Sequence, residues 1–366
     1  MRDAFKASFD SLKDDGLLVI VFANKETDAW ETLIRGLIRA GGEVTASWPI
    51  RTEMPNRTRS MSSAALSSSV WIVCRKRTAR AATGFDAQVL KEMRSVLLDP
   101  RKELDDRNLL QFYFQSGIHG PDFIWAALGP ALQAYSRYQL VRKTEGGVMS
   151  VTDFLKEVRH IVMQFSLGEL PGFSETRAAR EGKGANLNLD AVTQYYLLHR
   201  GFFGMAPAAA GACILYANAC GKSDRALQMG HHVIKLASKG TGGDDAKGNQ
   251  FQLLAWKERL KFPNLGESRN GETAPLIDRV HKLMELLKES KGAELRETFE
   301  RWGLSGEPAL RPLLFALRHL ANKAEDKEEE RILDVLTDQF FQGARAVEGV
   351  AAKEQARFDG EEFEEH

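Results

Sequence analysis

The sequence predicts a small α/β region followed by a large, mainly α-helical region. Three apolar runs typical of strands fall within residues 1–80, with one amphipathic helix before the first run and another after it. Beyond residue 80, apolar residues recur at helical spacing and strong helix formers dominate. Three strands make only a thin sheet, so we expect the remaining four fifths of the chain to be mostly helical.

The first predicted helix precedes the first strand. Phe5, Phe9 and Leu12 lie at i, i+4 and i+7, which places them on one helical face, and the turn Asp14–Gly16 ends the helix. Leu17–Ala23 then gives seven successive apolar residues without alternation. Because such a run is typical of a strand covered on both faces, we expect this strand to be buried in a parallel arrangement.

A second helix and two further strands follow. Asp28 and Glu31 have the spacing of a capping box at the start of a helix with an apolar stripe. Val44–Ile50 and Val70–Cys74 then read as strands, and the segment Arg51–Ser69 between them is a loop rich in Ser, Arg and Pro. The order helix, strand, helix, strand, strand indicates an α/β region.

Ten segments beyond residue 80 have the pattern of helices. They are Gln88–Leu98, Asp122–Tyr138, Val151–Leu167, Leu189–Arg200, Pro207–Cys220, Ser223–Ala237, Pro275–Ser290, Ala293–Trp302, Pro308–Ala324 and Glu328–Val347. Two glycine-rich polar stretches, Glu175–Asn188 and Lys239–Gln250, divide them. We therefore expect an α/β region at 1–80, a helical region at 81–240, and a second helical region at 241–366 with an acidic C-terminal tail.

Composition excludes several classes of protein. The 366 residues allow two or three domains, and 43% apolar with 27% charged residues is ordinary for a globular chain. The apolar runs are too short to span a bilayer and the N-terminus lacks a secretory signal, so we expect a cytoplasmic protein with no membrane partner. Fifty Lys and Arg residues balance fifty Asp and Glu residues, so any surface for a polyanion has to be local.

Charge is nonetheless distributed unevenly. Residues 51–80 contain seven Arg and Lys residues against Glu53 alone, whereas residues 325–366 contain fourteen acidic and five basic residues. We expect the first segment to attract a phosphate backbone and the second to repel it. The acidic run Glu325–Glu330 is typical of a solvated helix start.

Complete catalytic motifs are missing. No G-x-x-x-x-G-K-[ST], H-E-x-x-H, G-x-S-x-G or C-x-x-C occurs. His231 and His232 fit a surface or capping role late in a helix better than a metal site. Cys213 and Cys220 are interpreted as small buried residues that let helices approach, and together with Cys74 they fit reduced thiols. The residue patterns alone therefore predict no catalytic, cofactor-binding or metal-binding site.

Several longer strings rise above this background. They are Val19–Trp30, Val44–Glu53, Ser67–Arg77, Phe112–Ala126, Tyr195–Arg200, Gly211–Tyr216 and Ala274–His281. In these strings the chain resembles the adenine-specific DNA methylases that contain a Zn-ribbon, which are large proteins with an N-terminal domain of unknown function. The resemblance covers most of the chain.

The resemblance implies an activity. Such methylases transfer a methyl group from S-adenosylmethionine to the N6 amine of adenine in DNA, within modification or phage-defence systems. They resemble other amino-methyltransferases in using an F-x-G-x-G loop for the cofactor and a [DNS]-P-P-[YF] loop for the target amine. Neither loop occurs here, and the Zn-ribbon cysteines are missing too. The chain therefore looks like the C-terminal portion of such an enzyme, with no catalytic or cofactor-binding residues of its own and inactive alone.

The same resemblance implies a fold and a site. Residues 1–80 would be the edge remnant of a doubly wound, Rossmann-like methyltransferase sheet, in which the final strand runs antiparallel between its two neighbours. Ligands in such sheets bind beyond the carboxyl ends of the parallel strands. We therefore expect a base pocket at these strand ends, although Trp48 fits an ordinary core residue equally well. The pocket residues would be Asn24, Lys25, Trp48, Pro49 and Glu53.

The expected partners follow from the same interpretation. Arg51, Arg57 and Arg59 are candidates for contacts with DNA phosphates, and solvated loop arginines are an equal alternative. Besides DNA, we expect either an N-terminal methylase fragment or a second copy of this chain, paired along the strand Leu17–Ala23. The alternative function is a non-catalytic DNA-binding or protein-assembly module of a modification or defence system.

Overall fold

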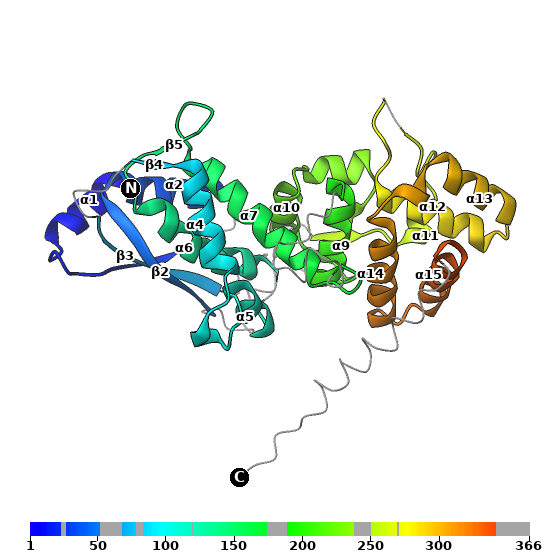
Figure 1. The fold of residues 1–366 in the computed structure, drawn as a ribbon, viewed down its shortest axis with the longest axis horizontal. Helices are drawn as coiled ribbons and strands as arrows, with labels where there is room; N and C mark the ends of the chain where they lie inside the picture. Colours follow the sequence, from blue (N-terminus) through cyan, green and yellow to red (C-terminus); the bar gives the residue numbers. More distant parts are fainter. Residues whose placement is uncertain are drawn as a thin grey trace, which may run out of the picture. The chain divides into compact units, whose positions relative to one another are not determined.

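The computed structural model folds into two compact units, and each is described here by itself. The first comprises Met1–Glu169 and Thr176–Ala255, and the second comprises Leu170–Glu175 and Trp256–His366. Helices dominate both units, and the strands form small sheets in the first (Figure 1). The structure describes residues 1–22, 27–51, 68–77, 83–118, 120–173, 189–237, 250–268 and 271–341.

The largest sheet contains the three strands that the sequence predicts. They are β1 (Leu18–Phe22), β2 (Gly42–Arg51) and β3 (Ser68–Lys76), in the order β1-β3-β2. Both outer strands run antiparallel to β3, so β1 and β2 are parallel to each other. The expected order, with the last strand antiparallel between the first two, is confirmed.

Two helices cover one face of this sheet. Helices α2 (Thr27–Arg39) and α6 (Pro121–Ser136) lie on the same side of the strands in Figure 1. The ring of Trp30 from α2 stacks on Trp125 from α6 with 4.6 Å between centroids, and it meets Phe22 of β1 edge-on at 4.8 Å. Helix α1 (Arg2–Ser11) packs against α2, and its buried Phe9 lies over Gly42 at the start of β2.

The opposite face of the sheet is exposed over much of its area, although Ser69, on the same side of β3 as Trp71, is buried. The side chains of β1 alternate, and Val19 and Val21 are 47% and 54% exposed. The prediction that the run Leu17–Ala23 is buried on both faces is therefore wrong for the residues of β1. The expected parallel arrangement is also wrong for its pairing, because β1 is hydrogen-bonded to β3 in the antiparallel sense. The physical reason is that the described helices cover the sheet from one side only, so the uncovered side of each strand faces solvent.

The rest of the first unit is built from helices and short strands. The helices are α4 (Asp86–Leu98), α5 (Leu109–Gln115), α7 (Val151–Gly168), α9 (Ala191–Phe203) and α10 (Ala210–Ala219). A 3-10 turn spans Lys102–Leu104 and a π turn spans Ala226–Gly230. Strand β4 (Gly84–Phe85) pairs in parallel with β5 (Val141–Arg142), and an antiparallel sheet has the order β6 (Ala208–Ala209), β8 (Gln250–Leu253), β7 (Ile234–Leu236).

The predicted helix Ser223–Ala237 is only partly helical. After the π turn, His232 adopts a positive φ of 49°, a backbone conformation that ends a helix. The chain then extends as β7, where Ile234 pairs with Leu253 of β8. Hydrogen bonding to a distant strand has overridden the local helical spacing, and His231 and His232 lie half-buried between the two elements.

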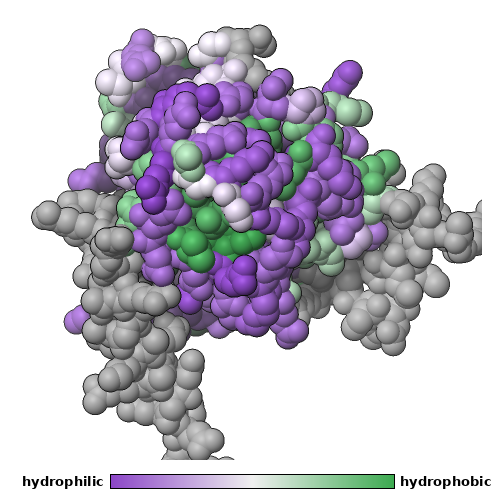
Figure 2. All heavy atoms as spheres, turned by 90° about the vertical axis from the view of Figure 1, so that its right-hand side faces the viewer, coloured by the Kyte–Doolittle hydropathy of each residue, from purple (hydrophilic) through white to green (hydrophobic). Residues whose placement is uncertain are grey.

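The second unit is helical among its described residues. It contains α11 (Trp256–Arg259), α12 (Leu276–Lys288), α13 (Gly292–Arg301), a 3-10 turn (Leu304–Gly306), α14 (Leu310–Lys323) and α15 (Lys327–Phe340). Asp326 caps α15 by accepting a hydrogen bond from the backbone N–H of Glu329, which confirms the acidic run as a helix start. The run is not solvated throughout, because Glu329 is buried. Phe299 and Phe340 stack with 3.8 Å between centroids. Figure 2 shows the α13 side of the molecule, where hydrophilic side chains surround a smaller apolar area.

Within the part of the chain that the structure describes, no helix is both long enough and apolar enough to cross a membrane.

Gly129 of α6 sets the distance between that helix and β2. A Cβ atom built at Gly129 would lie 1.6 Å from Oγ and 2.0 Å from Cβ of Ser47. We predict that Gly129→Ala lowers the free energy of unfolding by about 2–3 kcal/mol, because the helix and the sheet have to separate. Urea unfolding followed by circular dichroism measures the loss.

Gly168 at the end of α7 is the matched control, because a Cβ there would meet no atom within 4 Å. Gly168→Ala is expected to be neutral or to stabilise by up to about 1 kcal/mol. Equal effects of the two substitutions would contradict the close helix–sheet contact.

Candidate functional site

The predicted base pocket falls largely outside the described residues. β1 and β2 are parallel, so their carboxyl ends lie at the same end of the sheet. There, Phe22 of β1 is paired in register with Val70 of β3, and Arg51 of β2 is paired with Ser68 of β3. The predicted site residues that follow these strand ends lie outside the part of the chain that the structure describes. They are Asn24, Lys25, Glu53, Arg57 and Arg59.

Three predicted residues lie within β2. The structure places Pro49 and Arg51 in the strand without describing their side chains. Trp48 is described, and its side chain is 54% exposed on the open face of the sheet. The alternative interpretation of Trp48 as a core residue is therefore wrong, while its role as a pocket wall stays a prediction.

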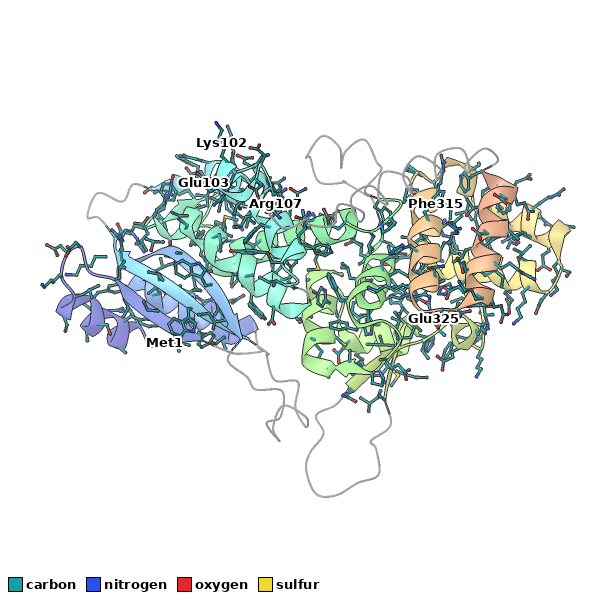
Figure 3. All side chains as sticks on the ribbon, turned by 90° about the horizontal axis from the view of Figure 1, so that it is seen from below. Met1, Lys102, Glu103, Arg107, Phe315 and Glu325 are labelled. Carbon is teal, nitrogen blue, oxygen red and sulfur yellow. The ribbon has the colours of Figure 1, made fainter. Side chains whose placement is uncertain are left out.

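Trp48 belongs to an apolar surface that the sequence analysis missed. The strand register places Val21, Trp71 and Trp48 in one row across the sheet, and Val19, Val73 and Ala46 in the next row. Figure 3, seen from below, shows the three strands at the left-hand end of this unit. We call this surface the open face and define it by its exposed large side chains: Leu17, Val19, Val21, Trp48, Ile50 and Trp71.

The open face is the main concentration of exposed apolar side chains. Thirteen large apolar residues are exposed among the described residues, and six of them lie here. Single exposed apolar residues are ordinary on a protein surface, whereas contiguous patches mark interaction sites. The signal for this surface was present in the sequence, since Val70–Cys74 and Leu17–Ala23 are apolar at every position and not only at alternate ones.

The open face continues into an open edge. Among the described strands, β1 pairs with β3 alone, so the backbone groups of Leu18–Phe22 on its other side have no strand partner there. Val19 and Val21 belong both to this edge and to the open face. The edge carries no charged residue or proline, which are the features that discourage pairing with another chain.

The basic segment beside the sheet is mostly engaged in internal contacts. The guanidinium of Arg77 donates hydrogen bonds to the carbonyl oxygens of Ser136, Ile38 and Gly42 at 2.8–2.9 Å, and burial lowers its pKa. Lys76 forms an ion pair with Asp14 at 3.2 Å. Of the basic residues in β3 and directly after it, only Arg75 is exposed and forms no ion pair with a described residue.

A buried polar cluster lies between α9 and α10. The hydroxyl oxygen of Tyr195 lies 3.0 Å from Nδ1 of His199, and Nε2 of His199 has no hydrogen-bond partner among the described residues. Burial lowers the pKa of His199 to about 4 and raises the pKa of both Cys213 and Cys220 to about 12. The imidazole is therefore neutral and the thiols are protonated near pH 7, which fits a structural role better than nucleophilic catalysis.

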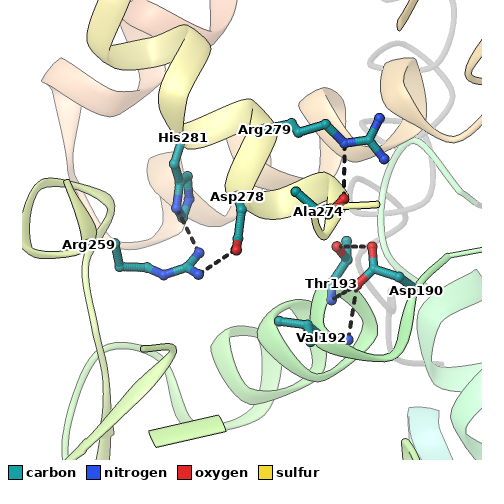
Figure 4. Close-up of polar contacts among 8 residues, drawn as sticks. All are labelled: Asp190, Val192, Thr193, Arg259, Ala274, Asp278, Arg279 and His281. Atoms are coloured by element: carbon teal, nitrogen blue, oxygen red, sulfur yellow. Dashed lines mark hydrogen bonds and ion pairs between the residues drawn. The ribbon is translucent and has the colours of Figure 1, made fainter. Parts of the chain in front are cut away.

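The second unit contains a buried ion pair (Figure 4). Arg259 of α11 is fully buried and donates hydrogen bonds to the carboxylate of Asp278 and to Nδ1 of His281, at 3.0 Å from the latter. Asp278 and His281 are three residues apart on α12, so both reach the same side of the helix. This arrangement satisfies a buried charge and joins two helices, and we assign it a structural role.

Figure 4 also shows the cap of α9 in the first unit, where Asp190 accepts hydrogen bonds from the backbone N–H groups of Val192 and Thr193 at 3.0 and 2.9 Å.

No group of three His, Cys, Asp or Glu residues in the described ranges could hold a metal ion. The open face and the open edge are therefore the strongest candidate site that the structure presents.

Comparison with known proteins gives no relative. No protein-family model, no curated protein and no solved structure matches this chain.

The buried imidazole of His199 makes stability depend on pH. Its pKa lies near 4 in the folded chain and near its ordinary value of 6.5 when unfolded. Between these values the unfolded chain binds a proton that the folded chain excludes, so the free energy of unfolding falls as the pH falls from 6.5 to 4. The expected loss is about 3 kcal/mol.

Urea unfolding at pH 7 and pH 4.5, compared with His199→Gln, isolates this contribution. The variant should lose most of the extra pH dependence. His160→Gln, at an exposed position of α7, should retain it. An identical pH dependence in the original chain and in His199→Gln would refute the contribution.

Proposed function

We propose that this chain is the C-terminal portion of an S-adenosylmethionine-dependent N6-adenine DNA methyltransferase of a cytoplasmic modification or defence system. The cofactor and catalytic loops would come from another polypeptide segment, so the chain is inactive alone. The observation that supports this proposal best is the three-stranded sheet, with an antiparallel strand between two parallel ones and with one open edge.

The location of the strand ends supports a site at this sheet. Ligands of open α/β sheets bind beyond the carboxyl ends of parallel strands. The carboxyl ends of β1 and β2 lie at the same end of the sheet. A base that is methylated has to leave the duplex and stack on an apolar or aromatic surface. We propose that Trp48, exposed near the end of β2, supplies part of that surface together with Asn24, Lys25, Pro49 and Glu53.

Cofactor binding tests this proposal directly. Titration calorimetry should detect no binding of S-adenosylmethionine to the chain alone, because the F-x-G-x-G loop is missing from its sequence. Mixing the chain with a methylase fragment that carries both missing loops should restore cofactor binding and transfer of labelled methyl groups to adenine in duplex DNA.

Two results would contradict the proposal. Micromolar binding by the chain alone, about 8 kcal/mol, would place the cofactor pocket within this chain. A complex of chain and fragment that transfers no methyl group would leave the chain without a role in methylation.

Phosphate contacts by the loop arginines give a second test. If Arg51, Arg57 and Arg59 each contact a phosphate, replacing all three with Ala should reduce the log–log salt slope of duplex DNA binding by about 2.7, or about 0.9 for each contact. Fluorescence anisotropy at several salt concentrations measures the slope.

Alanine substitutions at Arg94, Arg296 and Arg331, which are exposed elsewhere, should leave the slope unchanged. Equal slopes for the two triple variants would show that the loop arginines are solvated and contact no phosphate.

The second candidate function is a non-catalytic protein-assembly module of the same kind of system. The open face favours it, because a contiguous apolar surface with two tryptophans is typical of a protein interface. Stable association with a partner, without restored methyl transfer, would favour this alternative over the methyltransferase.

A further inference from the structure

Helix α14 carries a row of basic and aromatic side chains on its exposed side. Arg311, Phe315, His319 and Lys323 follow one another at intervals of four residues, and each is exposed or half-buried. The guanidinium of Arg311 lies over the ring of Phe315, at 5.7 Å from its centroid, and Figure 3 labels Phe315 on this helix. The helix contains no acidic residue. We call these four residues the basic stripe.

The positive charges of the basic stripe have no carboxylate partner among the described residues. Arg311 and Lys323 are exposed and form no ion pair there. Glu307, one turn before Arg311, instead accepts a hydrogen bond from the backbone N–H of Ala309 at 3.3 Å. Burial and the positive charge of Lys323 lower the pKa of His319. The stripe therefore has a positive potential that the described part of the second unit does not neutralise.

The contacts between α14 and α15 show at which end of the stripe the chain continues. Arg318 forms an ion pair with Asp334, and the side-chain amide of Asn322 donates a hydrogen bond to Glu330 at 2.8 Å. Four residues forward along α14 therefore correspond to four residues back along α15, so the two helices are antiparallel. The same register sets Arg311 opposite the last described residue of the chain. Residues 342–366 thus follow from the Arg311 end of the stripe.

Residues 342–366 lie outside the described residues, and their sequence complements the stripe. Five of the seven side chains in 359–365 are carboxylates, and Phe363 lies among them. Seven extended residues span about 23 Å, and the stripe spans about 18 Å from Arg311 to Lys323. The segment 342–358 is long enough to reach about 56 Å, so the acidic run 359–365 can reach the whole stripe.

We infer that the acidic run 359–365 docks on the basic stripe of α14 in the same chain. Its carboxylates pair with Arg311 and Lys323. Phe363 contacts the ring of Phe315. A single exposed ion pair contributes little, but several charges with an aromatic contact act together here. The tether gives the run a millimolar effective concentration, which favours it over the same run of a second copy. The docked run keeps other polyanions off the stripe, so the contact is autoinhibitory.

Carbodiimide crosslinking of the full chain tests the contact. The reagent joins a carboxylate to a lysine amine that touches it, and mass spectrometry of the digest locates each link. Links from 359–365 to Lys323 should be roughly tenfold more abundant than links to Lys261, which is exposed in the same unit. Arg311→Gln should reduce the links to Lys323 several-fold. Arg296→Gln, at an exposed position of α13, should leave them unchanged.

Binding of a heparin oligosaccharide measures how well the run shields the stripe. The neutral variant combines Asp359→Asn, Glu361→Gln, Glu362→Gln, Glu364→Gln and Glu365→Gln. Calorimetry should show that it binds heparin roughly tenfold more tightly than the original chain. Adding Arg311→Gln and Lys323→Gln to the neutral variant should cancel the gain.

A control variant with the same net charge separates shielding from overall charge. It neutralises five acidic residues at exposed positions elsewhere: Glu103→Gln, Asp106→Asn, Glu294→Gln, Glu297→Gln and Glu300→Gln. This variant should bind heparin about as the original chain does, because its stripe stays covered. Urea unfolding checks that each variant is folded.

Four outcomes would overturn the inference. The first is a set of links spread evenly over Lys323 and Lys261. The second is links only between copies in a mixture of two isotopically labelled chains, which would make a second copy the occupant. The third is equal heparin affinity of the neutral and control variants. The fourth is oligothymidylate binding that needs Arg311 and Lys323 but is as tight in the original chain as in the neutral variant, which would make nucleic acid the occupant.

Discussion

The three hydrogen bonds of Arg77 hold the sheet and its helices together. Its guanidinium bridges the ends of α2 and α6 and the start of β2, and Ser136 also accepts a hydrogen bond from the backbone N–H of Val44 at 2.8 Å. These contacts fix the ends of the elements whose middles meet at Gly129 and Ser47. Everything on the covered side of the sheet depends on this arrangement, including the stacked tryptophans.

Because the helices are fixed to one side, the other side of the sheet determines what the chain can do. Its apolar face and its edge strand adjoin each other through Val19 and Val21, so a single partner can cover both. The helical part of the first unit and the whole second unit offer buried polar groups with structural roles, such as Arg259 and His199. Function is therefore best sought where the sheet lacks cover.

The positions of the strands could be predicted from the sequence, because a short, uninterrupted apolar run favours a strand over a helix. The sequence predicted their burial poorly, because an apolar run does not reveal which face of a strand the other elements cover, and Val19 and Val21 of β1 are exposed. Arg77 was counted as a surface charge because spacing along the chain does not reveal three distant carbonyl groups. Arg259 could have been anticipated only in part, from the i, i+3 pair Asp278 and His281.

The three cysteines lie in two different parts of the first unit, so labelling with a thiol reagent reports on each part separately. Cys74 is buried between the sheet and its helices, whereas Cys213 and Cys220 are buried among the helices farther along the chain. Burial raises the pKa of each thiol to about 12, so a thiol reagent finds almost no thiolate in the folded chain. The rate of labelling at Cys74 therefore measures how fast the sheet opens. The rates at Cys213 and Cys220 measure how fast the helices open.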